Sequence, residues 1–135
     1  MQSMLENINI SLLAILTFHA IVFSQSGLDK IINWKGNLEF TTQTLTKKFP
    51  KSMVKIALFS VLIFEVLGGI FSLIGVIYTI IQPDCMLYAQ IGLSACSLAL
   101  LTLMLGQRIS QNYVDAKTIA IYFVVTTLGL MLAFN

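Results

Sequence analysis

The sequence predicts an all-α membrane protein, a bundle of four transmembrane helices with a short interfacial amphipathic helix between spans one and two. The first observation is composition: 57% of the 135 residues are hydrophobic and only 10% are charged, with a mean hydropathy of +0.88. A soluble domain of this size cannot bury so much apolar surface. The second is placement of charge, because all eight Lys and Arg fall within residues 30–55 and 108–117.

Four apolar stretches are expected to cross the bilayer as one domain, residues 1–135. Each has at least the roughly 20 residues that a span needs, and they cover approximately residues 8–28, 53–82, 86–106 and 114–134. The first stretch also resembles a signal peptide. It lacks a basic n-region and an A-x-A cleavage pattern, which favours a retained span.

The segment between the first two spans has the features of a membrane interface. Trp34 and Lys35 are typical of headgroup depth, and Gly36-Asn37 is expected to break the chain. Residues 38–49 then alternate apolar and polar faces at helical spacing and end before Pro50. They form either a helix lying on the membrane surface or an ordinary solvated loop helix.

The basic residues also predict the orientation of the bundle. The two basic segments join spans one to two and three to four, so they share a side. The positive-inside rule makes that side cytoplasmic and both termini extracytoplasmic. The clustering therefore indicates topology and not a nucleic-acid-binding surface.

Glu65 is the most informative residue, because it lies near the middle of the second span. A carboxylate at that depth must face protein, find a partner or stay protonated. Small residues follow it at helical spacing, which lets a neighbouring helix approach closely; this packing set is Gly68, Gly69, Ser72 and Gly75. Glu65 is therefore expected to point into the bundle.

Polar groups from all four spans are expected at similar depth. Counting about 1.5 Å per residue from the cytoplasmic ends gives depths of about 12–18 Å for the candidate ligand-binding residues Glu65, His19, Tyr122, Thr126 and Ser97. His19 and Glu65 are predicted to form one hydrogen-bonded unit. Ser97, Tyr122 and Thr126 are individually more typical of interhelical hydrogen bonds, whereas the expense of burying Glu65 favours a functional role.

A second polar group is expected at the inner rim, with two interpretations. Pairing among Asp29, Lys30, Arg108 and Asp115 would fasten the ends of the helices together, or these residues would form a dock for an anion or partner. No metal site and no covalently bound cofactor are expected, because the chain has one histidine and neither CxxC nor CxxCH.

Short motifs along nearly the whole chain resemble the DoxX family of small four-span membrane proteins. They are Gly27-Leu28-Asp29-Lys30, Phe49-Pro50, Glu65-x-x-Gly68-Gly69 with Gly75, Arg108 through Asn112-Tyr113, and Ala116 to Tyr122-Phe123. The resemblance implies a four-helix bundle in a bacterial cytoplasmic (inner) membrane. Some family members are similar to the small subunit of a thiosulfate:quinone oxidoreductase, which implies quinone or a redox partner.

Three functions are compatible with these features. The first is a membrane subunit serving a quinone-linked redox system, in which His19 and Tyr122 donate hydrogen bonds and Glu65 handles a proton. Without a flavin, haem or iron–sulfur signature, such a subunit is not expected to be catalytic alone. The second is a structural or assembly subunit of a larger membrane protein complex, and the third is a small proton-coupled transporter. All three place the chain in a lipid bilayer, and the first two require other membrane proteins.

Overall fold

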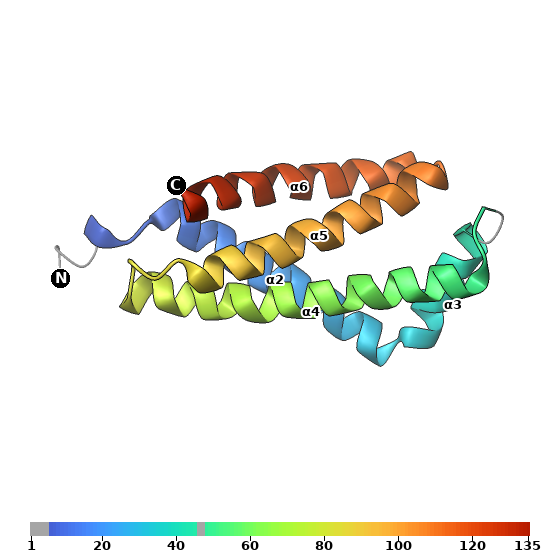
Figure 1. Ribbon diagram of the computed structural model, residues 1–135, viewed down its shortest axis with the longest axis horizontal. Helices are drawn as coiled ribbons and strands as arrows, with labels where there is room; N and C mark the ends of the chain where they lie inside the picture. The colour runs from blue at the N-terminus through green and yellow to red at the C-terminus, as the bar shows by residue number, and fades with distance from the viewer. Residues whose placement is uncertain (1–5, 46–47) are drawn as a thin grey trace.

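The computed structural model describes residues 6–45 and 48–135, and its long elements are all helices (Figure 1). In chain order they are α2 (Ile10–Ile32), α3 (Trp34–Leu45), α4 (Lys51–Ile81), α5 (Leu87–Ile109) and α6 (Tyr113–Phe134). No strand occurs in the described ranges. The prediction of a helical bundle is therefore confirmed.

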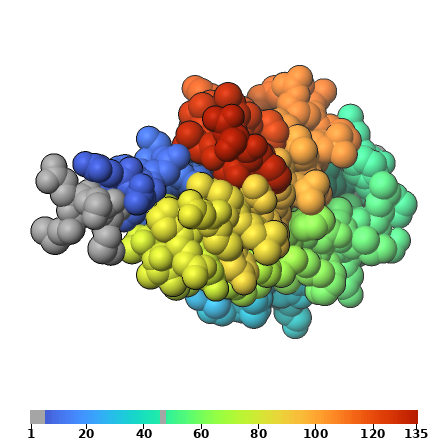
Figure 2. All heavy atoms as spheres, turned by 60° about the vertical axis from the view of Figure 1, so that its left-hand side comes forward, coloured from blue at the N-terminus to red at the C-terminus, as the bar shows by residue number. Residues whose placement is uncertain are grey.

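Four of these helices, α2, α4, α5 and α6, are long and apolar enough to cross a membrane. They alternate in direction, so that the start of α2 and the end of α6 lie at one end of the bundle and α3 at the other (Figure 1). At the end away from α3, the α4–α5 turn lies beside the end of α6 (Figure 2), where the Gln90 amide donates to the Ala133 carbonyl at 2.9 Å. The length and composition of the helices are those of a multi-pass membrane protein.

Helix α4 is the centre of the bundle, since it packs against both α2 and α5, while α6 packs mainly on α5. Small residues bring the backbones of α4 and α5 together. A Cβ added to Gly92 would lie 2.7 Å from the Ser72 nitrogen, and one added to Gly75 would lie 3.2 Å from the Ala89 nitrogen. Neither side chains nor water can separate helices at such distances.

The small residues of α4 serve two interfaces. A Cβ on Gly68 would meet Cys96 of α5, whereas one on Gly69 would lie 2.8 Å from the backbone nitrogen of Ser24 in α2. Ser72 is fully buried on the α5 side. The packing residues predicted from the sequence therefore lie where α4 contacts α2 and α5.

The boundary between α2 and α3 differs from the sequence expectation. Helix α2 continues to Ile32 instead of ending at Leu28, and the chain breaks at Asn33 and not at Gly36-Asn37. The Asn33 N–H completes the last turn by donating to the Asp29 carbonyl, while its own φ and ψ of −115° and 46° leave the helical region. Gly36 and Asn37 lie inside α3, where the Asn37 N–H and side-chain amide both donate to the Asn33 carbonyl.

Helix α3 is described as far as Leu45, residues 46–47 of the expected helix lie outside the described residues, and Phe49 lies in a bend. None of its residues is buried. It contacts α4 and α2, and the Trp34 ring packs edge-on against Phe59 of α4 with ring centroids 6.2 Å apart. This docking holds α3 beside the bundle, where it can form one wall of a cavity.

The turn between α5 and α6 is a compact hydrogen-bonded structure. Gln111 has a φ of 60°, the Gln111 N–H donates to the Arg108 carbonyl, and the Asn112 N–H donates to the Gln107 carbonyl at 2.9 Å. This is the Schellman pattern that ends many helices, usually with glycine at the left-handed position. The Asn112 side chain then accepts from the Asp115 N–H at the start of α6.

Candidate functional site

An ion pair joins α2 to α4 in the interior. The Lys30 Nζ lies 2.9 Å from the Glu65 Oε2 and 3.2 Å from its Oε1. The Ser26 hydroxyl donates to Oε1 at 3.0 Å, and Lys30 also donates to the Ser26 oxygen at 3.0 Å. Glu65 is 2% exposed and Lys30 is 9% exposed, so this cluster is removed from solvent.

The local sequence of α2 explains this arrangement. Ser26 and Lys30 are four residues apart, so they lie one above the other on the same helical face. Gly27 lets that face approach α4, because a Cβ there would come 2.9 Å from the Val66 side chain. A buried carboxylate is tolerated when it is paired and hydrogen-bonded, and the α2 face supplies both partners.

The predicted pairing of Glu65 with His19 is not what the structure shows. The Nε2 of His19 lies 2.7 Å from the Thr126 Oγ1, and its Nδ1 lies 2.7 Å from the Ile15 carbonyl. The depth estimate failed because α2 runs further than expected, which carries Ser26 and Lys30 to the level of Glu65. From His19 to Ser26 the helix rises about 10 Å, so His19 belongs to a different layer.

The His19 layer is fully buried. His19 and Thr126 are both 0% exposed. The Ile15 carbonyl can only accept, so Nδ1 donates to it. The single proton of the Thr126 hydroxyl has two acceptors within reach, the Tyr122 carbonyl at 2.8 Å and the Nε2 of His19 at 2.7 Å. Phe23 stacks on the imidazole at an interplanar angle of 2°, and Phe18 contacts its edge.

Tyr122 and Ser97 are peripheral to this layer. The Tyr122 ring is half-buried and contacts Phe18 edge-on, with centroids 5.8 Å apart. Ser97 is half-buried on α5. Within residues 6–45 and 48–135, no side-chain hydrogen bond joins either residue to His19. Of the five ligand-binding candidates, only His19 and Thr126 are joined by their side chains in the described residues, and the Thr126 hydroxyl also lies 2.8 Å from the Tyr122 backbone carbonyl.

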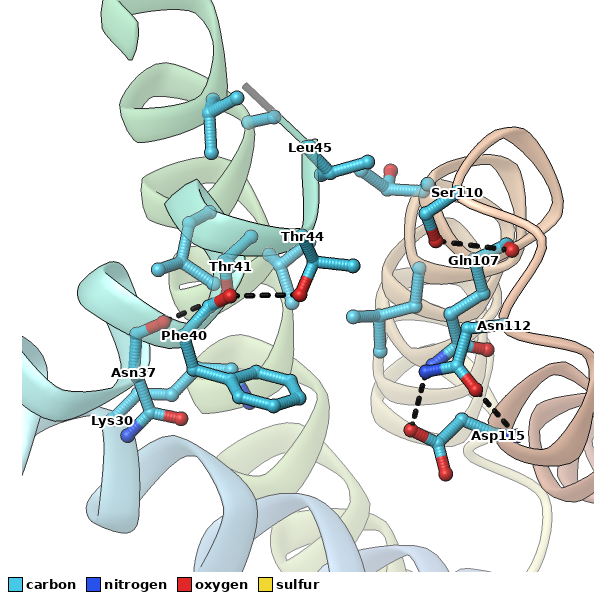
Figure 3. Close-up of a pocket in the computed structure, with 17 residues that line it drawn as sticks. Lys30, Asn37, Phe40, Thr41, Thr44, Leu45, Gln107, Ser110, Asn112 and Asp115 are labelled. Atoms are coloured by element: carbon cyan, nitrogen blue, oxygen red, sulfur yellow. Dashed lines mark hydrogen bonds between the residues drawn. The ribbon is translucent and has the colours of Figure 1, made fainter. Parts of the chain in front are cut away.

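A cavity of about 230 Å³ adjoins the Lys30–Glu65 pair at the α3 end of the bundle. Figure 3 shows α3 residues on one side and residues of the α5–α6 turn on the other. Lys30 forms part of the wall, and Glu65 lies behind it. The apolar lining is Phe40, Leu45, Val54, Ala57, Leu58, Val61 and Leu103; the other polar lining is Asn37, Thr41, Thr44, Thr102, Gln107, Ser110, Asn112 and Asp115.

A smaller apolar space of about 110 Å³ continues from this cavity between α4 and α5. The two share five lining residues, namely Leu45, Val54, Ala57, Thr102 and Gly106. The remaining residues around the smaller space are Phe49, Met53, Leu105 and Ile109. A polar-lined chamber therefore leads into an apolar one.

The predicted pairing among the four inner-rim residues, Asp29, Lys30, Arg108 and Asp115, is wrong. Asp29 accepts from the Asn37 amide at 3.3 Å, Asp115 accepts from the Asn112 amide at 2.7 Å, and the Arg108 guanidinium lies over the Tyr113 ring. In the described part of the chain, Lys30–Glu65 is the only ion pair. The rim acids lie at helix ends, where nearby amides satisfy them, and Lys30 points inward.

Ser26 and Gly92 are contributors that sequence reasoning missed. Ser26 was detectable as a polar residue one turn before Lys30. Gly92 was detectable from its spacing with Ala89 and Cys96, which gives α5 a small-residue face matching that of α4. Across the described ranges, no group of three His, Cys, Asp or Glu residues is arranged to hold a metal ion.

No family model, curated protein or solved structure matches the chain.

Proposed function

We propose that this chain is a membrane subunit of a quinone-linked redox system and that it binds a quinone-class head group in the cavity beside Lys30. The observation that carries this proposal is the combination of a chamber that has both polar and apolar walls with a buried ion pair at its edge. Intramembrane ion pairs usually mark a ligand or proton site, because they are expensive to maintain. The resemblance to the DoxX family points to the same class of ligand.

The dimensions of the cavity suit a head group and not a whole lipid. A volume of about 230 Å³ is below the roughly 300–1,000 Å³ of pockets that enclose a drug-sized molecule. A substituted six-membered ring fits such a chamber between Phe40 and Val61. The adjoining apolar space between α4 and α5 then accommodates the start of an isoprenoid tail, which would continue into lipid.

In this proposal the two polar layers have different roles. Lys30 contacts the ligand, and Glu65 holds the ammonium in place. His19 and Thr126 fix α2 to α6 and do not contact the ligand. This assigns ligand binding to Lys30 and its surroundings and leaves His19, Tyr122 and Ser97 outside the site.

The proposed orientation places the cavity near the cytoplasmic surface. Five lysines outside the ion pair, among them Lys35, Lys51 and Lys55, surround the α3 end of the bundle, and basic loops stay in the cytoplasm. A redox partner on that side would reach the cavity between α3 and the α5–α6 turn.

The test is the quinone content of the full-length protein purified in detergent, measured by chromatography of the extracted lipids. Ala57 lines both chambers, so Ala57→Phe should fill the passage and abolish the retained quinone. Ala14→Phe is the matched control, because Ala14 is exposed on α2, and it should retain quinone like the wild type. A wild-type protein that neither retains quinone nor binds added quinone would contradict the proposal.

The second candidate is a structural subunit of a membrane complex, and the observation that favours it is the bridge from α2 to α4 through Lys30 and Glu65. In that case the pair serves only assembly. A Lys30→Met/Glu65→Leu double variant would then be folded and would co-purify with the same partner proteins as the wild type. Loss of quinone from a folded double variant would favour the first proposal.

A further inference from the structure

The hydroxyl groups that line the cavity donate their protons to the backbone of their own helices. Each hydroxyl group has one proton to donate and two lone pairs that can accept. Thr41 donates to the Asn37 carbonyl and Thr44 to the Phe40 carbonyl, both at 2.8 Å. Thr102 donates to the Leu98 carbonyl and Ser110 to the Gln107 carbonyl. All four hydroxyls therefore present only acceptor lone pairs to the cavity.

The charged and amide donors of the lining are also largely engaged. The Lys30 ammonium has three protons and donates hydrogen bonds to Ser26 and to the Glu65 Oε1, while the Glu65 Oε2 holds the charge at 2.9 Å. The Asn37 amide donates to the Asn33 carbonyl and to Asp29. One N–H of Asn112 is used by Asp115. The free donors are therefore the second N–H of Asn112 and the amide of Gln107.

Acceptors remain in excess, and one of them lacks a partner. The Gln107 Oε1 is buried and accepts no hydrogen bond from the described residues. Gln107 lines the cavity next to Ser110 and Asn112 (Figure 3). A buried acceptor left alone costs free energy, and a ligand O–H within reach would satisfy it. The Asp115 carboxylate lies at the same rim, and in its ionised form it can accept hydrogen bonds but not donate them.

We infer that this cavity selects the reduced, hydrogen-bond-donating form of its ligand, a quinol over a quinone. This inference rests on the proposed function. A quinone offers two carbonyl acceptors, which would face a lining made mainly of acceptors. A quinol of the same shape offers two O–H donors, which match the free lone pairs of the threonines and the Gln107 oxygen. The inference concerns binding alone and involves no electron transfer.

The experiment compares three soluble probes on the full-length protein in detergent, under nitrogen, by titration calorimetry. They are a decyl-substituted benzoquinone, its two-electron-reduced quinol, and the dimethyl ether of that quinol, which keeps the ring but has no O–H. We expect the quinol to bind at least about tenfold more tightly than the other two, since one or two satisfied hydrogen bonds amount to about this factor.

Gln107→Leu removes the unpartnered acceptor together with a free amide donor, so it should weaken quinol binding several-fold and quinone binding by a smaller factor. Gln43→Leu is the control, because Gln43 is an exposed residue of α3 outside this cavity, and it should change neither affinity. Should Gln107→Leu fail to fold, the nearly isosteric Thr44→Val makes the same test on another acceptor.

The outcomes separate the two proposals. Equal affinities for quinol and quinone, or tight binding of the dimethyl ether, would overturn the inference and leave the proposed function standing. Failure of all three probes to bind would overturn both. Tight quinol binding that Gln107→Leu and Thr44→Val leave unchanged would also overturn the inference, because the named acceptors would then have no part in selection.

Discussion

The two buried polar clusters of this bundle differ in what lies beside them. His19 and Thr126 are sealed between α2 and α6, with aromatic rings covering the imidazole. Lys30 and Glu65 lie between α2 and α4, with a cavity on one side. Both clusters pair polar side chains from two helices of similar apolar composition. Burial of a polar residue therefore does not by itself indicate a ligand site, and of the two clusters only the Lys30–Glu65 pair has room for a ligand beside it.

The largest expected effect comes from breaking the ion pair. Glu65→Leu leaves the Lys30 ammonium buried without its partner, which should lower the free energy of unfolding by about 3–5 kcal/mol. The double variant Lys30→Met/Glu65→Leu should recover most of that loss, because no buried charge remains. Denaturant titration of the detergent-solubilised protein measures both. Equal losses in the single and double variants would show that the two charges do not stabilise each other.

A smaller effect is expected from the contact between α4 and α5. Gly92→Ala places a Cβ 2.7 Å from the Ser72 backbone nitrogen, which should cost about 1–3 kcal/mol of stability through overpacking. Gly106→Ala on the same helix is the control, since its Cβ would meet only the Leu45 side chain at 3.8 Å. That change should be neutral or stabilising by up to about 1 kcal/mol. Thermal unfolding of the two variants decides the point, and similar midpoints would refute the close packing.

The smallest expected effect is the coupling between the two clusters. In a double-mutant cycle, His19→Leu and Glu65→Gln should reduce stability additively to within about 0.5 kcal/mol, because they share no partner. The cycle of His19→Leu with Thr126→Val should instead show coupling of about 1 kcal/mol, the size of one hydrogen bond. Strong coupling between His19 and Glu65 would mean that the clusters form one unit after all.

The helices and the packing residues of α4 could be anticipated because they depend on composition and on helical spacing. A run of apolar residues predicts a span, and Gly68 and Gly75 one above the other predict a close helix contact. The register between helices could not be anticipated. It depends on where α2 ends, and this is decided by one asparagine, Asn33, and not by the more conspicuous Gly36-Asn37.

For the same reason, the sequence predicted one residue of the candidate site but not its partner. Glu65 was identified because its burial is expensive in any arrangement. Its partner was assigned to His19 from estimated depth, whereas the side chain that pairs with it, Lys30, comes from about three helical turns further along α2. The cavity itself depends on the docking of α3 against the bundle, which no periodicity of the sequence encodes.

The position of the ion pair has a consequence for how the protein enters a membrane during synthesis. Glu65 lies near the centre of α4, where a lone charge raises the free energy of insertion by about 2.5–3.5 kcal/mol. Lys30 is synthesised first and lies within a turn of the end of α2, so its long side chain can reach the headgroups while it waits. When α4 arrives, the ammonium can turn inward and neutralise the incoming carboxylate. Helix α2 thus supplies the counter-charge for the carboxylate of α4, and the order of the two helices in the chain favours their insertion as a pair.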